Sequence, residues 1–162
     1  MPSKIWQERL ACRPLGLQLY WQGPRLLRLE LFFCKQSLSR AGLSLQGTRI
    51  LNFLQGYLNG QALGPPRITL AWEVVSEFQS RVLSGLQAAV NNGQQISYQG
   101  LAELCGRPNS ARAVGRVMAR NPWPLLIPCH RVLAKGGHLG GFSSGLEIKR
   151  FLLDLEGITY KE

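Results

Sequence analysis

Hydrophobic and polar residues alternate in two short stretches of the first half of the chain. Residues 16–21 and 26–33 are each typical of a β-strand, and the Gln22-Gly23-Pro24 segment between them is typical of a tight turn. Residues 48–58 instead show helical spacing, and a helix is predicted there. Its buried face is expected to carry Ile50, Phe53, Leu54 and Tyr57. The pattern predicts a small α/β domain with a short antiparallel sheet.

A break follows this region. Residues 60–67 contain Pro65-Pro66 and two glycines, a composition that interrupts regular structure. We therefore predict two domains, 1–66 and 67–162, and an α+β fold overall. A chain of 162 residues is long enough for two small domains that share an interface.

The second half has helical periodicity. One helix is predicted over 74–90, and its core face is expected to carry Val75, Phe78, Val82, Leu83 and Leu86. Ser97 and Ser110 stand where the N-caps of two further helices belong, ahead of 98–105 and 111–120. The short, glycine-containing turn between these two helices is typical of a helix-turn-helix.

The second of these helices has two different faces. Its core face is expected to carry Val114, Val117 and Met118, and its outward face to carry Arg112, Gly115, Arg116 and Ala119. Apart from the two arginines, the outward face is almost bare, so the backbone can approach a groove of DNA closely. This pattern predicts DNA contact, against the alternative that the arginines are simply solvated.

The net positive charge of the chain also favours DNA as the partner. The chain has 19 Lys and Arg against 9 Asp and Glu, a formal charge of +10. Such an excess favours nucleic acid first and an anionic membrane second, although a basic surface can also serve solubility. The residues near the start carry charge where a signal peptide needs an apolar core, and no apolar run is long enough to span a bilayer. We expect a cytoplasmic protein with free thiols and no metal, since the cysteines and histidines lack zinc-ligand spacing.

The segment Pro128-Cys129-His130-Arg131 follows a short apolar run at Leu125–Ile127 and carries the candidate chemistry. A cysteine beside a histidine can be a nucleophile with its base, or a buried, inert thiol. Adjacent side chains of an extended chain point to opposite sides, so we expect a bridging water between Cys129 and His130. The imidazole then needs an acceptor on its other nitrogen, which spacing alone does not identify.

The run from Ile96 to Gly157 closely resembles the O6-alkylguanine-DNA alkyltransferases. The matching segments are ISYQGLAELCG, SARAVGRVMARNPWPLLIPCHRVL and GGFSSGLEIKRFLLDLEG, and Pro-Cys-His-Arg is highly specific. The resemblance implies irreversible, single-turnover transfer of an alkyl group from O6-alkylguanine, and also O4-alkylthymine, in DNA to Cys129. It implies a ribonuclease-H-like N-terminal domain and a monomer that acts on double-stranded DNA without a cofactor. The protein would be nuclear if its source is eukaryotic.

The resemblance also assigns roles to residues. Cys129 accepts the alkyl group, His130 removes its proton through a water, and Glu156 orients His130. Asn121 is the hinge that ties the helix-turn-helix to the active-site strand, and Tyr98 donates a proton to the leaving guanine. The substrate-binding residues implied are Tyr98, Val132, Phe142 and Ser143. The DNA-binding residues implied are Tyr98, Gln99, Arg107, Ala111, Arg112 and Lys135, with Arg112 filling the gap left by the extruded base.

Three positions depart from the family pattern. Phe142 stands where Tyr is frequent, Ser144 where Gly is common, and Asn91-Asn92-Gly93 where Pro-aromatic-Gly is usual. We expect Ser144 to narrow the pocket against bulky adducts. The N-terminal half also lacks the zinc-binding Cys and His set of some animal members.

Three other functions compete with alkyl transfer. An alkyltransferase-like protein would bind lesions without repair, but it carries another residue in place of Cys129. A helix-turn-helix transcription regulator has no use for the Pro-Cys-His-Arg segment or Glu156. A thiol hydrolase needs an oxyanion hole and a histidine free to reach the sulfur, which the adjacent Cys129 and His130 disfavour.

Overall fold

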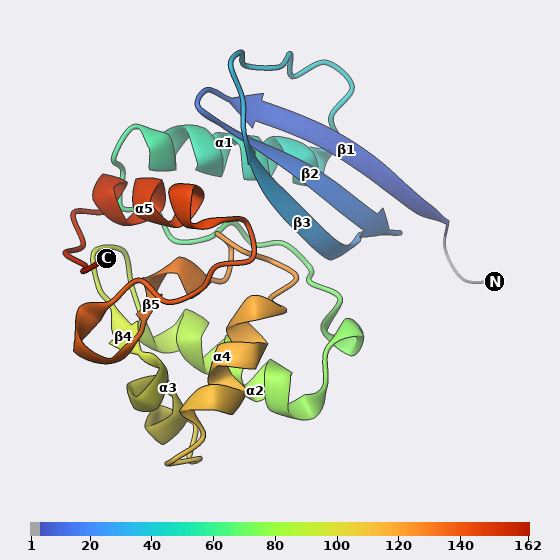
Figure 1. The fold of residues 1–162 in the computed structure, drawn as a ribbon. Helices are drawn as coiled ribbons and strands as arrows, with labels where there is room; N and C mark the ends of the chain where they lie inside the picture. The colour runs from blue at the N-terminus through green and yellow to red at the C-terminus, as the bar shows by residue number, and fades with distance from the viewer. Residues whose placement is uncertain (1–3) are drawn as a thin grey trace. The chain divides into compact units, whose positions relative to one another are not determined.

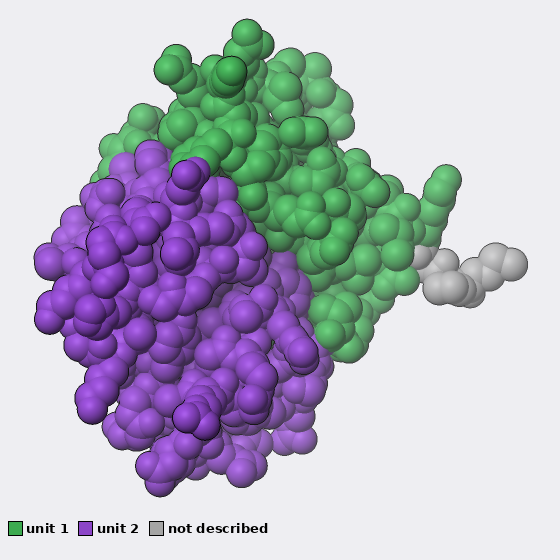
Figure 2. All heavy atoms as spheres, viewed as in Figure 1, with its two compact units in different colours: residues 1–74 green, residues 75–162 purple. Residues whose placement is uncertain are grey.

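The computed structural model describes residues 4–162, which form two compact units divided between Val74 and Val75 (Figure 2). A three-stranded antiparallel sheet and, within the described residues, five α-helices make up a mixed α/β fold (Figure 1). The predicted combination of a short antiparallel sheet with helices is confirmed at this level. None of the helices in residues 4–162 is long and apolar enough to cross a membrane.

The first unit is built on the sheet. Its strands, in the order β1-β2-β3, are β1 (Ile5–Cys12), β2 (Leu15–Gln22) and β3 (Arg25–Phe33), and helix α1 spans Leu45–Leu58. The two predicted strands and the predicted helix are confirmed, and Gly23 takes the left-handed φ of 56° that the turn between β2 and β3 needs. The hydrophobic pattern did not predict β1, because only Glu8, Leu10 and Ala11 of this edge strand are buried.

A buried carboxylate joins β1 to α1. Glu8 accepts hydrogen bonds from the backbone N–H and the hydroxyl of Ser44, the N-cap of α1. The hydroxyl of Ser44 in turn accepts from the Gly47 N–H at 2.9 Å. A negative charge at this position is favourable because the free N–H groups of a helix start carry partial positive charge.

The predicted break contains no helix or strand, and the chain then returns to the sheet. Leu26 N–H donates to Thr69 O at 2.9 Å and Ala71 N–H donates to Leu26 O at 3.0 Å. These bonds hold the segment after residue 66 against β3. The predicted boundary between residues 66 and 67 lies just before these hydrogen bonds. The division into domains 1–66 and 67–162 stays a prediction.

The second unit is mainly helical. Its helices are α2 (Glu77–Ala89), α3 (Tyr98–Leu104), α4 (Ala111–Ala119) and α5 (Leu146–Leu155). Two short parallel strands, β4 (Ile96–Ser97) and β5 (Val132–Leu133), pair beside them. Helix α2 begins later than predicted, because Ser76 and Gln79 form a capping box and a separate 3-10 helix occupies Trp72–Val74.

Of the two serines predicted to cap helices with their side chains, only one does so. The Ser97 hydroxyl accepts from the Gly100 N–H at 2.9 Å and caps α3 as expected. Ser110 occupies the N-cap position of α4 but makes no capping bond with its side chain, so that prediction is wrong. Its φ of −101° and ψ of 21° are not the extended conformation from which a cap side chain reaches the first turn. The predicted core face of α4 is confirmed, with Val114, Val117 and Met118 buried.

Candidate active site

Cys129 opens a 3-10 helix, Cys129–Arg131, that leads directly into β5. The turn is closed by a hydrogen bond from Arg131 N–H to Pro128 O at 3.0 Å, and the Cys129 side chain is almost completely buried. The expectation of an extended chain at Cys129 and His130 is therefore wrong. The argument that adjacent side chains point to opposite sides holds for a strand and does not apply to this turn. The relative positions of the Cys129 thiol and the His130 imidazole are set by the turn instead.

Asn121 fixes the segment that delivers this turn. Its Nδ2 donates to Ile127 O at 3.0 Å, and its Oδ1 accepts from the Trp123 N–H at 3.0 Å. Leu125, between them, has a φ of 72°, a conformation that costs a non-glycine residue free energy and persists only when its surroundings enforce it. Asn121 comes just after Arg120, the C-cap of α4, so one side chain connects the end of that helix to the approach to Cys129.

His130 and Arg131 converge on one carboxylate. Glu156 Oε1 lies 2.7 Å from His130 Nε2, and Arg131 binds the same carboxylate through Nε at 2.7 Å and Nη2 at 3.0 Å. The side chains of His130 and Glu156 are 0% and 1% exposed, so solvent screens these interactions very little. Arg131 Nη1 also donates to Val90 O at 3.0 Å, which anchors the network at the end of α2.

This network fixes the protonation of His130. Because a carboxylate paired with a guanidinium accepts hydrogen bonds, His130 Nε2 carries the proton and Nδ1 keeps its lone pair. Within residues 4–162, Nδ1 is buried and has no hydrogen-bond partner in the protein. Burial lowers the pKa of His130, against the opposing effect of Glu156, so the ring is neutral at neutral pH. A neutral imidazole with a buried lone pair can act as a base.

The thiol is also neutral before reaction. Burial raises the pKa of Cys129 to about 11, and a hydrogen bond with Asn121 and the charge of Lys149 offset this only in part. A neutral thiol beside a neutral imidazole avoids placing an unpaired charge in a buried site. A thiolate could therefore form at Cys129 only if a neighbouring base takes the proton from the sulfur.

Lys149, on α5, is completely buried. Its ammonium donates to Val132 O at 2.9 Å, to Gly141 O at 3.2 Å and to Leu139 O. Burial lowers the pKa of Lys149 to about 8, so the amine is mainly protonated at neutral pH. One charge thus ties β5, just after the Cys129 turn, to the loop that leads to Phe142.

We expect Lys149→Met to destabilise the protein by about 1–3 kcal/mol, because its buried carbonyl partners lose their donor while the volume of the side chain is kept. Urea unfolding followed by far-UV circular dichroism measures the change. Lys161→Met, at an exposed position, is the control and should leave the midpoint unchanged. Equal midpoints for Lys149→Met and the unsubstituted protein would show that the ammonium does not support these carbonyls.

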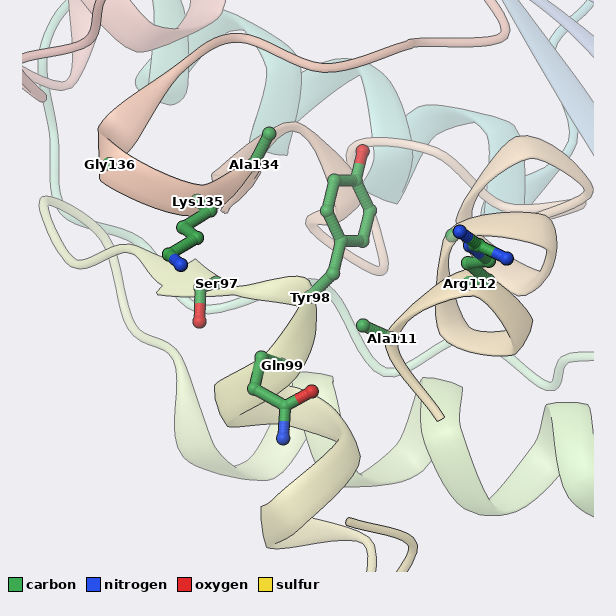
Figure 3. Close-up of a pocket in the computed structure, with 9 residues that line it drawn as sticks. Ser97, Tyr98, Gln99, Ala111, Arg112, Ala134, Lys135 and Gly136 are labelled. Atoms are coloured by element: carbon green, nitrogen blue, oxygen red, sulfur yellow. The ribbon is translucent and has the colours of Figure 1, made fainter. Parts of the chain in front are cut away.

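A pocket of about 760 Å³ lies between α3, α4 and the 3-10 helix Lys135–Gly137. Figure 3 shows the Tyr98 ring between Arg112 on α4 and Lys135. The pocket brings together five of the predicted DNA-binding residues, namely Tyr98, Gln99, Ala111, Arg112 and Lys135.

Tyr98 connects this pocket to the thiol. Burial raises the pKa of its hydroxyl, and the neighbouring Cys129 raises it further, so the phenol holds its proton. The hydroxyl packs against Gly140, where a Cβ would come within 2.9 Å of it and where φ is +64°. Only glycine fits both conditions, so the loop after β5 can pass close to Tyr98.

The other predicted site residues lie outside this pocket lining. Arg107 is exposed in the turn between α3 and α4, and Val132 is buried in β5 with its carbonyl bound to Lys149. Phe142 is half-buried and Ser143 exposed in the loop before α5. The structure places each of them on a segment next to Cys129, Tyr98 or α4, and their roles stay predictions.

The sequence interpretation missed Arg131 and Lys149. Arg131 was quoted in its motif without a role, and nothing in the local sequence indicates that it shares Glu156 with His130 across 25 residues. Lys149 carried a usable signal, because it stands on the same helical face as Ile148, Leu152 and Leu153, all of them buried. Within residues 4–162, no group of three or more His, Cys, Asp or Glu side chains could hold a metal ion.

Comparison with known proteins gives consistent matches. Residues 77–158 match the family model described as 6-O-methylguanine DNA methyltransferase, DNA binding domain. A human methylated-DNA--protein-cysteine methyltransferase is 36% identical over 156 residues, covering 80% of this chain and 75% of the human protein. The crystal structure of Mycobacterium tuberculosis OGT in complex with DNA superposes with a TM-score of 0.70 at 31% identity, covering 88% of this chain and 87% of that one. The O6-methylguanine-DNA methyltransferase of Pyrococcus kodakaraensis gives a TM-score of 0.72 at 26% identity, covering 96% of this chain and all of that one.

Proposed function

The chain belongs to the 6-O-methylguanine DNA methyltransferase family, and from this premise we propose that it repairs alkylated DNA by direct reversal. It transfers the alkyl group from O6-alkylguanine in DNA to Cys129, once per protein molecule. The observation that carries the proposal is the buried His130–Glu156–Arg131 network beside a buried cysteine. Such a network holds a neutral imidazole in place as a base, which a buried, neutral thiol needs in order to lose its proton.

The reaction follows from the protonation states. His130 Nδ1 takes the Cys129 proton through a water, while Glu156 and Arg131 hold the ring in the tautomer that has this lone pair free. The sulfur attacks the alkyl carbon, so a carbon–sulfur bond forms as the bond between carbon and O6 breaks. The departing guanine takes a proton from Tyr98, whose raised pKa keeps the phenol protonated beforehand. The phenolate then regains a proton from solvent as the His130 imidazolium releases its own, so both groups return to their neutral forms. The thioether that forms is stable, because regeneration would require the Cys129 thiolate to leave from an unactivated carbon, and the protein therefore acts only once.

Access to the O6 alkyl carbon requires the base to leave the duplex. We propose that α3, the turn and α4 act as a helix-turn-helix in the minor groove, and that Arg112 fills the gap left by the extruded nucleotide. The bare outward face of α4 supports close approach, and Arg112 and Tyr98 line the same pocket. The extruded guanine would contact the Val132 carbonyl, Phe142 and the Ser143 N–H.

The remaining proposals concern partners and context. Gln99, Arg107, Ala111 and Lys135 would contact the DNA backbone, which fits a basic protein with little sequence preference. We propose that the protein works as a monomer without cofactor, in the cytoplasm or in a eukaryotic nucleus, that it also accepts O4-alkylthymine, and that its N-terminal unit is ribonuclease-H-like.

The direct test uses the free base O6-benzylguanine, which needs no DNA. We expect the benzyl group to appear on the Cys129 peptide, as located by tandem mass spectrometry. Ser144 is expected to slow this reaction relative to Ser144→Gly, because a bulky adduct must pass the side chain. A regulator would bind duplex DNA but leave every cysteine unmodified.

Arg112→Ala should slow repair of O6-methylguanine in duplex DNA by about 10- to 100-fold, because extrusion costs a few kcal/mol and the variant loses the side chain that holds the gap open. The reaction with free O6-benzylguanine should change far less, since no base is extruded. Single-turnover rates for both substrates give the comparison. Arg116→Ala removes the same charge from the same helix and is the control. Equal losses with both substrates would refute the role of Arg112 in extrusion.

A further inference from the structure

The first unit holds a pocket of about 490 Å³ that the proposed repair reaction does not use. It is lined by Arg49, Asn52, Phe53, Leu63, Gly64, Pro66 and Arg67. Its volume is within the usual range for a site that binds a small organic molecule.

Two sets of contacts hold the walls of this pocket together. Arg49, Asn52 and Phe53 stand at helical spacing on one face of α1. The opposite wall is anchored beside that helix by the hydrogen bond from Gln61 N–H to Gly56 O, at 3.0 Å, and Leu63 packs so closely on Gly56 that a Cβ there would overlap it. Beyond residue 67 the chain is bonded to β3. The pocket is therefore a built feature between two fixed segments.

The charges around the pocket are uncompensated. Residues 1–74 contain nine Lys and Arg against three Asp and Glu. All three acids are already engaged, Glu8 by Ser44, Glu30 by Arg28 and Glu73 by Arg25. Within the described part of the chain, no hydrogen bond or ion pair involves the side chains of Arg49, Asn52 or Arg67. Both guanidiniums are free for an anion.

Besides the two arginines, the lining of the pocket includes the apolar side chains of Phe53, Leu63 and Pro66. Arginines beside an apolar, partly aromatic surface suit a ligand that joins a phosphate to a flat ring, which is the combination that single-stranded nucleic acid offers. Duplex DNA presents phosphates without exposed base faces. We propose that this pocket binds a nucleotide of single-stranded DNA, with its phosphate between Arg49 and Arg67, its base on the apolar wall and Asn52 at the base edge. The choice of DNA as the source of the nucleotide rests on the proposed repair function.

The test is a titration of the full-length, ¹⁵N-labelled protein followed by backbone amide chemical shifts. The probes are inorganic phosphate, thymidine, thymidine 5′-monophosphate and a short oligothymidylate. We expect the monophosphate and the oligonucleotide to shift the amides of Arg49, Asn52, Phe53 and Arg67, with phosphate and thymidine alone binding more weakly. The oligonucleotide should bind at least about tenfold more tightly than the monophosphate, because flanking phosphates add contacts with the basic unit. Equal affinity would overturn the assignment to a DNA strand in favour of a free nucleotide.

Variants locate the effect. Arg49→Gln combined with Arg67→Gln should weaken oligonucleotide binding at this site at least about tenfold, since each guanidinium makes charge-assisted bonds to phosphate. Arg40→Gln removes a charge from the same unit and is the matched control, because Arg40 bonds the neutral side chain of Gln55. Shifts confined to residues 75–162, or unchanged affinity in the double variant, would overturn the proposal. Benzyl transfer to Cys129 from O6-benzylguanine, measured on the same samples, tests the proposed repair function separately.

Discussion

Cys129→Ser is expected to abolish alkyl transfer while leaving binding to duplex DNA that contains O6-methylguanine intact. A serine hydroxyl is a much weaker nucleophile than a thiolate, and His130 cannot deprotonate it to a comparable extent. The substitution keeps the shape of the turn, because the hydroxyl replaces the sulfur without other change. Transfer is measured as labelled methyl on the protein, and binding as fluorescence anisotropy of the damaged duplex.

Cys105→Ser is the matched control, because Cys105 is a half-buried thiol in the same unit and has no histidine beside it. That variant should transfer at the normal rate. Methyl transfer by Cys129→Ser, or an adduct mapped to Cys12, Cys34 or Cys105, would contradict the assignment of Cys129 as the acceptor.

Glu156→Gln should produce the second large loss, in rate and in stability together. The carboxylate accepts from His130 and Arg131 in a site that solvent does not reach. A neutral amide leaves the Arg131 charge without its partner, which typically costs about 3–5 kcal/mol in a buried pair. It also releases the imidazole from the tautomer that can accept the thiol proton, so we expect transfer to slow by about 10²- to 10⁴-fold. Single-turnover kinetics and thermal unfolding measure the two effects.

Glu162→Gln offers a matched comparison on the surface. Glu162 pairs with Arg150 through two hydrogen bonds, at 2.9 and 2.6 Å, but its side chain is 68% exposed. Loss of an exposed pair usually costs about 0–1 kcal/mol because water and salt already screen it. A similar small effect of Glu156→Gln would show that the buried network does not support either the fold or the base.

Hydrophobic periodicity predicted the helices and strands correctly where one face of the element is buried and the other is exposed. The strands at 16–21 and 26–33 and the helix at 48–58 are of this kind, and so is α4, whose buried residues lie on one side. Periodicity failed for β1, because this strand lies at the edge of the sheet and exposes Ile5 and Trp6. The side-chain cap predicted from residue type at Ser110 is also absent, because capping depends on backbone angles that residue type does not determine.

The residues of the candidate site could be predicted only where a sequence motif or the family resemblance included them. Cys129 and His130 stand together in sequence, and Glu156 and Tyr98 entered through the family resemblance. The conformation of Cys129–Arg131 was not predictable from the motif, because a four-residue segment can be extended or turned depending on what precedes it. Here the turn at Leu125 and the two bonds of Asn121 determine it. Lys149 was missed because a lysine is ordinarily exposed, and only its three carbonyl partners make its burial favourable.

The proposed reaction moves two protons, and each of them involves a different side chain. In the proposed reaction the thiol proton goes to His130, because burial raises the pKa of Cys129 to about 11 and the thiol does not ionise by itself at neutral pH. In the same proposal the proton for the leaving guanine comes from Tyr98, whose burial raises the pKa of its hydroxyl and keeps it protonated beforehand. On this account the reacting groups carry no net charge until the alkylated base arrives, and the charge of Lys149 favours the thiolate as it develops.

The central claim is that one alkyl group moves from DNA to Cys129 and stays there. Intact-protein mass spectrometry, after incubation with increasing amounts of duplex DNA containing O6-methylguanine, tests it most directly. We predict that each molecule gains the mass of one methylene unit, that the gain stops at one equivalent however much DNA is added, and that peptide mapping places it on Cys129. An unchanged mass, a methyl group on another residue, or repair of more than one equivalent of DNA per protein would contradict the claim.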